Sequence, residues 1–208
     1  MHDLTIQQPA ADGSTEQLFL LFHGVGSHAQ DLRGLATALA ARHPRAWVVN
    51  VQSPDPSDQG QGWQWFSVKG VTSDNRPERV AATMPRFVQA VHGWQQRSGV
   101  PAGNTTLLGF SQGAIMALEA TQRQPALAAR VAAMAGRFAA PPRHAAKGVR
   151  IHLLHGQADT VVPTTCSVDA HAQLQALHAD VTLDLIPNLG HGIDEQMAAR
   201  LWARLATP

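Results

Sequence analysis

The sequence predicts an α/β protein with a mostly parallel, doubly wound sheet, and two features of the chain support this prediction. Short apolar runs, such as "LFLLF" at Leu18–Phe22, are continuous rather than alternating, which is typical of strands buried on both faces. Between these runs lie longer segments with apolar residues at helical spacing. Strands that alternate with helices are joined by right-handed crossovers, which place helices on both faces of a parallel sheet.

The elements follow one another without an internal repeat or a low-complexity linker. The predicted strands cover residues 17–23, 46–51, 104–110, 129–136, 149–156 and 180–186. The predicted helices carry apolar faces over residues 32–39, 80–94, 112–123, 166–177 and 197–205. Pro44 ends the first helix, Pro85 predicts a kink or a late start in the second, and Asp194 is a suitable N-cap for the last. We therefore expect one domain over residues 1–208.

Composition excludes several classes of protein. The chain has 208 residues, of which 44% are hydrophobic and 15% charged, as is ordinary for a folded globular protein. Its net charge of +1 comes from scattered basic residues, so we expect neither a nucleic-acid surface nor stable membrane association. The N-terminal residues lack the basic and apolar regions of a secretory signal, and the single cysteine, Cys166, fits a reducing compartment. We expect a cytoplasmic protein.

One short motif carries chemistry. Gly109-Phe110-Ser111-Gln112-Gly113 fits G-x-S-x-G, the nucleophile elbow of α/β-hydrolases, in which the serine sits on a strained turn between a strand and a helix. The motif is weak by itself, because so short a pattern also arises by chance. Here a predicted strand precedes Ser111 and a predicted helix follows it, which is the context that the motif requires.

A serine nucleophile needs a base, and the base needs an orienting carboxylate. In α/β-hydrolases these partners follow the serine in the order acid, then histidine. Asp159 comes just after the predicted strand 149–156, and His191 comes just after the last strand. Asp169 and Asp184 are weaker candidates for the acid. The carboxyl ends of parallel strands are where ligands collect in such sheets, so we expect Ser111, Asp159 and His191 to meet there.

The tetrahedral intermediate of acyl transfer needs two N–H donors for its oxyanion. The residue after the nucleophile, Gln112, supplies one in this fold. The stretch "FHGVG" at Phe22–Gly26 has the H-G-x-G form of the loop that supplies the other, and we assign that donor to Val25 N–H.

The chain resembles the bacterial YpfH-type serine esterases, within the carboxylesterase/phospholipase family of α/β-hydrolases. This family is related to acyl-protein thioesterases and dienelactone hydrolases. The resemblance rests on "LLFHGVG", "QWFSVKGVTSDNR", "GFSQGAIMALE" and "TLDLIPNLGHGID", and it covers nearly the whole chain. It implies a triad of Ser111, Asp159 and His191, with Val25 and Gln112 N–H groups as the oxyanion hole.

Two positions depart from the family pattern. Thr160 stands where proline often follows the acidic residue, and the change should be harmless because a proline there only rigidifies the turn. Trp63 stands where relatives often carry an arginine. A substrate contact made by that arginine therefore does not transfer to this chain.

Other reactive side chains favour different roles. Cys166 lies on the apolar face of a predicted helix, which favours a buried packing role over a nucleophile. His152 and His155 are predicted to point to opposite faces of a strand, so they cannot share a metal ion. His171 and His178 could share a helix face, but no acidic or cysteine partner lies nearby at ligand spacing. We expect no metal and no cofactor.

The substrate pocket is less clearly marked. Trp63, Trp65 and Phe66 end a loop that follows a strand on the active-site side, and we predict that they bind substrate together with His23 of the "FHGVG" loop. Arg137 either contacts an acidic substrate group or forms an ordinary surface pair. The stretch between the strands at 129–136 and 149–156 is short and rich in Ala and Pro, so we expect no cap or lid.

The sequence thus predicts a serine carboxylesterase that cleaves short- to medium-chain esters, with a small-molecule ester as its partner. An acyl thioesterase or a lysophospholipase would use the same residues, and a ligand-binding fold with a dead site is the non-enzymatic alternative. The presence of the whole triad and of the oxyanion loop in one chain argues against a dead site. A homodimer stays open, since nothing in the sequence fixes the oligomeric state.

Overall fold

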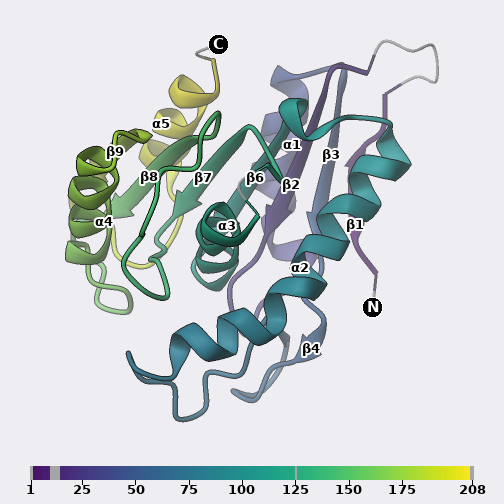
Figure 1. Ribbon diagram of the computed structural model, residues 1–208. Coiled ribbons are helices and arrows are strands. Elements are labelled where there is room, and N and C mark those ends of the chain that lie inside the picture. The colour runs from purple at the N-terminus through teal and green to yellow at the C-terminus, as the bar shows by residue number, and fades with distance from the viewer. Residues whose placement is uncertain (1, 10–14, 125, 207–208) are drawn as a thin grey trace.

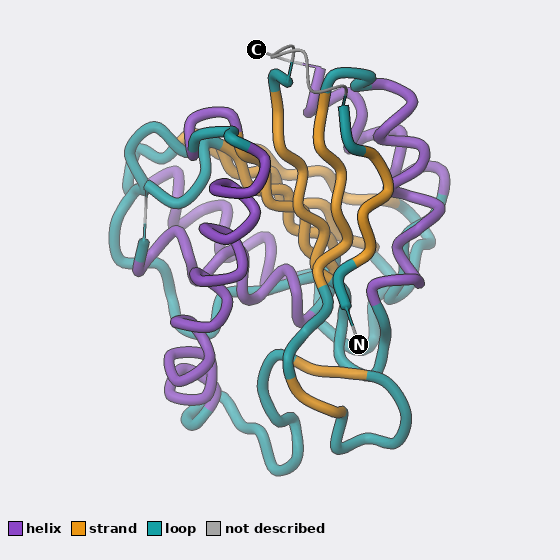
Figure 2. Tube along the Cα trace, turned by 90° about the vertical axis from the view of Figure 1, so that its right-hand side faces the viewer, coloured by secondary structure: helices purple, strands orange, loops and turns teal. Residues whose placement is uncertain are grey.

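The computed structural model describes residues 2–9, 15–124 and 126–206. It has three layers, with a central sheet between two layers of helices (Figures 1 and 2). Helices α2 (Arg76–Ser98), α3 (Gln112–Arg123) and α4 (Thr165–Ala176) cover one face, and α1 (Arg33–Arg42) and α5 (Glu195–Ala206) cover the other. Two short 3-10 helices, η1 (Ala29–Leu32) and η2 (Ala102–Asn104), precede α1 and β6 (Thr105–Phe110).

The sheet has seven strands in the order β1-β3-β2-β6-β7-β8-β9. Besides β6, these are β1 (Leu4–Gln7), β2 (Gln17–Phe22), β3 (Ala46–Val51), β7 (Arg130–Met134), β8 (Arg150–Gly156) and β9 (Asp180–Ile186). Only β1 runs antiparallel to its neighbour, and the other pairs are parallel. The predicted fold class is confirmed: this is the compact α/β-hydrolase arrangement.

Most predicted elements agree with the structure to within two residues. Strand β3, strand β9 and helix α3 match their predicted ranges residue for residue. Asp194 accepts a hydrogen bond from Met197 N–H at 2.8 Å, as an N-cap should. The edge strand β1 and the small hairpin of β4 (Asp55–Pro56) and β5 (Trp63–Gln64) were not predicted.

Helix α2 corrects one expectation. It begins at Arg76 and continues through Pro85 to Ser98, so the late start that Pro85 suggested is wrong. A proline cannot donate a hydrogen bond to the carbonyl one turn earlier, which makes it costly inside a buried helix. Pro85 lies on the exposed side of α2, where water can satisfy the freed carbonyl of Ala81.

Two apolar cores hold the layers together, one on each face of the sheet. On the face of α2, α3 and α4 the core includes Phe22, Trp65 and Phe87. On the face of α1 and α5 it includes Phe19, Leu39 and Leu201. Alternate residues of β2 point into the two cores, as the period of a strand requires, and this explains why the sequence of β2 is apolar throughout.

The connection from β7 to β8 is short and irregular. Residues 135–149 contain no helix or strand, in agreement with the absence of a predicted cap. Within the described ranges, no helix is long and apolar enough to cross a bilayer.

This connection is held by a buried carboxylate. Glu119 of α3 accepts hydrogen bonds from Ala139 N–H at 2.7 Å and Ala140 N–H at 3.4 Å. Burial raises the pKa of the Glu119 carboxyl, although these N–H donors and Arg123 oppose the rise. A raised pKa means that the folded state binds the proton more tightly than the unfolded state. The contribution of Glu119 to stability is therefore present at low pH and is lost as the pH rises.

We predict that Glu119→Gln, which keeps an acceptor oxygen but removes the charge, raises the melting temperature at pH 8 by about 2–4 °C. The difference from wild type should shrink at pH 4, where Glu119 is protonated. Thermal melts at the two pH values test this, with the exposed Glu78→Gln as the control that changes little. An equal loss of stability at both pH values would show that the carboxylate stabilises the fold.

Candidate active site

Ser111 occupies a sharp turn between β6 and α3. Its backbone has φ 51° and ψ −114°, in the positive-φ region that a residue with a Cβ atom rarely adopts. A hydrogen bond from Ser111 N–H to Met134 O at 2.9 Å ties the turn to the end of β7. The predicted strand, elbow and helix are therefore present.

Small residues let the turn form. A Cβ atom on Gly109 would lie 2.4 Å from the backbone of Ala114, and one on Gly113 would lie 2.2 Å from the carbonyl oxygen of Phe22. A Cβ atom on Gly24 would lie 3.1 Å from the Cβ of Ser111. Two glycines of the motif are thus required by the close approach of α3 to β6 and β2.

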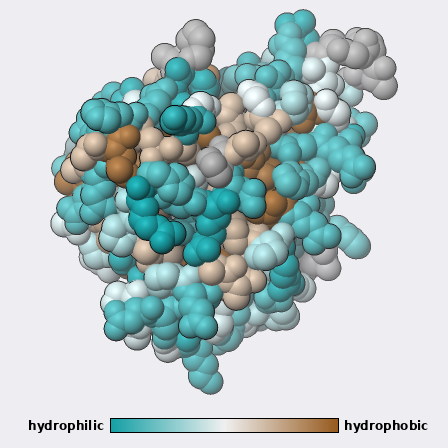
Figure 3. All heavy atoms as spheres, viewed as in Figure 1, coloured by the Kyte–Doolittle hydropathy of each residue, from teal (hydrophilic) through white to brown (hydrophobic). Residues whose placement is uncertain are grey.

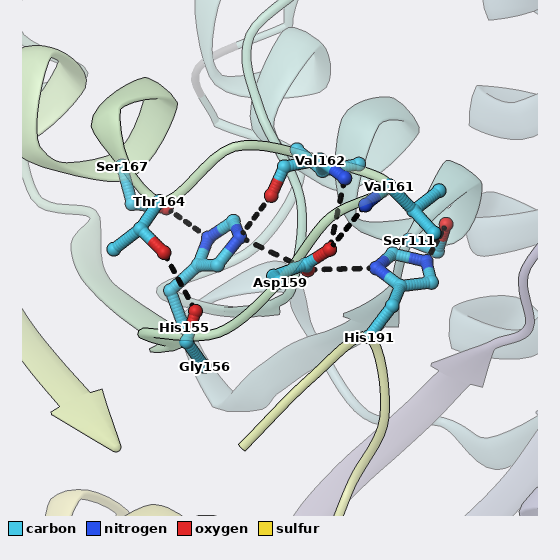
Figure 4. A network of polar contacts seen from close by, with 9 residues as sticks. All are labelled: Ser111, His155, Gly156, Asp159, Val161, Val162, Thr164, Ser167 and His191. Carbon is cyan, nitrogen blue, oxygen red and sulfur yellow. Dashed lines mark hydrogen bonds and ion pairs between the residues drawn. The ribbon is translucent and has the colours of Figure 1, made fainter. Parts of the chain in front are cut away.

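His191 joins Ser111 to Asp159 (Figure 4). Its Nε2 lies 2.9 Å from Ser111 Oγ, and its Nδ1 lies 2.7 Å from Asp159 Oδ2. Because a carboxylate only accepts, Nδ1 carries the hydrogen, and the neutral ring accepts from the serine hydroxyl through Nε2. The ring of Phe110 packs against the imidazole, with 5.2 Å between ring centroids.

The loops after β8 and β9 are bonded to each other, and this brings Asp159 to His191. Gln157 N–H donates to Ile186 O and Ala158 N–H donates to Leu189 O, both at 2.9 Å. A Cβ atom on Gly156 would lie 2.3 Å from Leu189 O, so the contact requires a glycine there. Thr160 in the same loop forms no part of this pairing.

The carboxylate of Asp159 is fully buried and well supplied with donors. Its Oδ1 accepts from Val161 N–H at 2.8 Å and Val162 N–H at 2.9 Å. Burial alone would raise the pKa of this carboxyl, but hydrogen bonds from His191, Val162 and Val161 outweigh it and hold the pKa below its ordinary value. Asp159 is therefore an anion at neutral pH.

The "FHGVG" loop faces this group from the end of β2. Gly26 N–H donates to Trp63 O at 2.9 Å, and Trp63 N–H donates to Ser27 O at 3.0 Å, so the β5 backbone braces the loop. Among the hydrogen bonds of the described residues, none uses Val25 N–H as a donor. Gln112 is the first residue of α3, where a helix leaves its N–H groups without an acceptor one turn earlier.

His23 supports the same loop. Its Nε2 accepts from Ser53 N–H at 3.1 Å, so Nδ1 carries the hydrogen and donates to Gly24 O at 2.7 Å. Burial is the main cause that lowers the pKa of His23, which favours the neutral ring. The residue is 1% exposed and both ring nitrogens are hydrogen-bonded, so His23 holds the loop, and its contact with substrate stays a prediction.

The aromatic residues of the predicted pocket lie deeper than expected. Trp65 and Phe66 are 1% and 5% exposed and belong to the core. The side chain of Gln112 fixes them, since its Oε1 accepts from Trp65 N–H and its Nε2 donates to Phe66 O, both at 2.7 Å. Trp63 is half-buried. Substrate contact by these aromatic residues stays a prediction, whereas the bracing roles of Gln112 and Trp63 were not foreseen.

The other candidates for the acid and the nucleophile lie away from Ser111. Asp184 pairs with Arg204 at 2.7 Å. Asp169 and Cys166 line a separate cleft of about 280 Å³ with Arg137, whose guanidinium pairs with no carboxylate of the described residues.

His152 and His155 point to opposite faces of β8, where they bond to Thr182 and Ser167. Throughout the described residues, no three histidine, cysteine or acidic side chains cluster as a metal ion requires.

Fold and site together are those of an α/β-hydrolase. The chain belongs to the phospholipase/carboxylesterase family, whose model matches residues 2–207. It is 45% identical over 196 residues to Esterase YpfH of Escherichia coli K12, covering 94% of this chain and 84% of that protein.

Solved structures agree with this assignment. The crystal structure of esterase PE8 is 27% identical, with a TM-score of 0.86 over 95% of each chain. A carboxylesterase from Mesorhizobium loti, 21% identical, has the same fold, with a TM-score of 0.78 over 97% of this chain and 99% of that one. The protein is therefore a member of a hydrolase family.

The glycines of the elbow allow a direct test. We predict that Gly113→Ala, which forces a Cβ atom against the carbonyl of Phe22, destabilises the fold by at least about 2 kcal/mol. Gly93→Ala is the matched control, because Gly93 lies on the exposed side of α2 with no atom within 4 Å of an added Cβ. It should leave stability unchanged or raise it by up to about 1 kcal/mol. Thermal melts of both variants check this, and equal melting temperatures would contradict the tight packing of the elbow.

Proposed function

We propose that the protein is a serine carboxylesterase that hydrolyses short- to medium-chain esters through an acyl-enzyme intermediate. The observation that carries the proposal is the continuous hydrogen-bonded chain from Ser111 Oγ through His191 to Asp159. The name of the relative Esterase YpfH supports an ester as substrate. A small soluble ester in the cytoplasm is the partner that we propose.

The proposed reaction has two halves. Ser111 Oγ attacks the ester carbonyl while His191 Nε2 takes the hydroxyl proton, and the proton then passes to the departing alcohol. Water attacks the acyl-enzyme in the same way, returns a proton to Ser111 through His191 and releases the carboxylic acid. Asp159 holds the imidazole tautomer and stabilises the imidazolium that forms in each half.

The oxyanion of each tetrahedral intermediate is assigned to Val25 N–H and Gln112 N–H. Preorganised donors of this kind contribute about 3 kcal/mol each to transition-state stabilisation. Gln112 N–H also lies at the N-terminus of α3, where the helix dipole favours negative charge. The bonds of Trp63 with Gly26 and Ser27 support this role for Val25, because they fix the loop before substrate arrives.

Ser111→Ala tests the nucleophile. We predict that the variant folds like wild type, since it loses only a hydroxyl, and that its kcat on p-nitrophenyl butyrate falls by at least about three orders of magnitude. A fluorophosphonate should label wild type once, at Ser111, and the variant not at all. Cys166→Ala is the control and should be labelled like wild type. Labelling at Cys166, or substantial activity of Ser111→Ala, would contradict the assignment of Ser111 as the nucleophile.

The absence of a covering element argues for small substrates. Residues 135–149 form no helix that could close over Ser111. Figure 3 shows the face that α2, α3 and α4 cover, where polar side chains lie around apolar ones. Each methylene of an acyl chain that is buried contributes about 0.8 kcal/mol of binding free energy. In an open site only the first few methylenes are buried, so longer chains bind no more tightly.

We therefore predict the highest kcat/KM for p-nitrophenyl esters with acyl chains of about two to eight carbons. The rate should not jump when the substrate passes its solubility limit, because no apolar lid has to open at an interface. Kinetics on an ester series from acetate to palmitate check this. A steady rise out to palmitate, or interfacial activation, would favour the lysophospholipase or long-chain thioesterase alternative.

A further inference from the structure

A second histidine contacts the carboxylate of Asp159 from the side opposite to His191 (Figure 4). His155 lies near the end of β8, its side chain is fully buried, and its Nε2 is 3.2 Å from Asp159 Oδ2. This is the same oxygen that His191 Nδ1 contacts at 2.7 Å. The proposed mechanism assigns no role to His155.

The hydrogen bonds of His155 fix where its proton lies. Nε2 is 2.9 Å from Val162 O, and because a carbonyl oxygen only accepts, Nε2 carries a hydrogen. That hydrogen is directed at Val162 O, and Asp159 Oδ2 lies 3.2 Å from the same nitrogen, within range of an electrostatic contact with the N–H group. Nδ1 lies 2.6 Å from Ser167 Oγ of α4, whose hydroxyl can donate to it. Ser167 is buried, so the ring is held from a rigid helix.

We propose that His155 is a positioning residue of this active site, whose Nε2–H group holds Asp159 Oδ2 by a close electrostatic contact and which is itself oriented by Ser167. The proposal rests on the proposed function, since it gives His155 a part in the same proton transfer. The chain of polar contacts then has five members and runs from Ser111 through His191, Asp159 and His155 to Ser167.

The geometry explains why such a residue is useful. Two backbone N–H groups hold Oδ1, but a carboxylate anchored through one oxygen can still turn about the Cβ–Cγ bond. The His191 N–H group bonds to Oδ2 on one side and the His155 N–H group contacts it on the other, which fixes the plane of the carboxylate. Support of this kind is what holds a catalytic group within a fraction of an ångström of its productive position.

A merely structural role would have a different signature. His155 also bonds to Val162 O, so it could act only by holding the loop that follows β8. In that case its loss would lower stability without changing the proton transfer. The titratable groups that contact Asp159 are His155 and His191, and α4 contributes the uncharged hydroxyl of Ser167. A change in the pH profile can therefore be traced to this network.

The sign of that change follows from charge. The positive end of the His155 N–H dipole lies beside Oδ2 and stabilises its negative charge, which weakens the attraction of Oδ2 for a protonated His191. Removal of the donor leaves Oδ2 more negative, so the imidazolium is stabilised. The acidic limb of the kcat/KM profile, which reports loss of a proton by the base, then moves to higher pH.

Four variants separate the two roles. His155→Leu removes both hydrogen bonds, whereas His155→Gln keeps an N–H donor at a similar reach. Ser167→Ala removes only the group that orients the ring. His152→Leu is the matched control, because His152 lies on the same strand, is 1% exposed and bonds to Thr182 on the other face of the sheet, away from Asp159.

With p-nitrophenyl butyrate, we expect His155→Leu to lower kcat about tenfold while KM stays within about twofold. The midpoint of its kcat/KM profile should rise by about half a pH unit. His155→Gln should recover most of the loss, and Ser167→Ala should lie between wild type and His155→Leu. His152→Leu should lower the melting temperature but leave kcat and the midpoint unchanged.

The rate of labelling by a fluorophosphonate, measured against pH, repeats the test without an ester substrate. If wild type is labelled and hydrolyses the ester but His155→Leu matches it in kcat and midpoint, this proposal is overturned and the proposed function stands. The proposal is likewise overturned if His155→Gln is as impaired as His155→Leu, or if Ser167→Ala behaves like wild type. If wild type is neither labelled nor active, the proposed function fails first. Should His155→Leu not fold, the Gln and Ala variants decide the question.

Discussion

The backbone of Ser111 is the constraint on which the rest of the site depends. An L-amino acid at φ 51° is strained, and it persists only where the surroundings leave it no alternative. Here the hydrogen bond to Met134 O holds one side of the turn, and close packing at Gly109 and Gly113 holds the other. The same turn lifts Oγ above the sheet and begins α3, so one local distortion provides both the hydroxyl and the N–H group of Gln112.

The order of strands then assembles the remaining parts. Ser111 and His191 are 80 positions apart in sequence, yet parallel strands release their loops at one edge of the sheet. Each loop is braced by a neighbour: the β5 backbone holds the "FHGVG" loop, and the turn after β9 holds the turn after β8. Polar groups that do not react, such as the side chains of His23 and Gln112, supply much of this bracing. The geometry is thus fixed before a substrate binds.

The sequence predicts those parts that leave a local signature. Continuous apolar runs mark β2 and β3, and the G-x-S-x-G pattern marks Ser111 within its strand and helix. Strand β1 escapes prediction because "LTIQ" is short and half-exposed, and its pairing with β3 depends on distant residues. Trp65 is expected at the pocket because it ends a loop, but the Gln112 side chain draws its backbone inward. The contact of His155 with Asp159 leaves no such signature, because a spacing of four residues indicates contact only on a helix and His155 lies in a strand.

Because β1 runs antiparallel to β3, it begins at a different edge of the sheet from the end of α5, which matters when the protein is attached to a surface. Leu4 pairs with Asn50 near the carboxyl end of β3, so the N-terminal part of the chain starts at the same edge as Ser111 (Figure 1). The end of α5 lies at the opposite edge, where Leu205 O accepts a hydrogen bond from Arg130 at the start of β7. Attachment to a solid support through the end of α5 would leave the edge that carries Ser111 facing solution. Attachment through β1 would turn that edge toward the support.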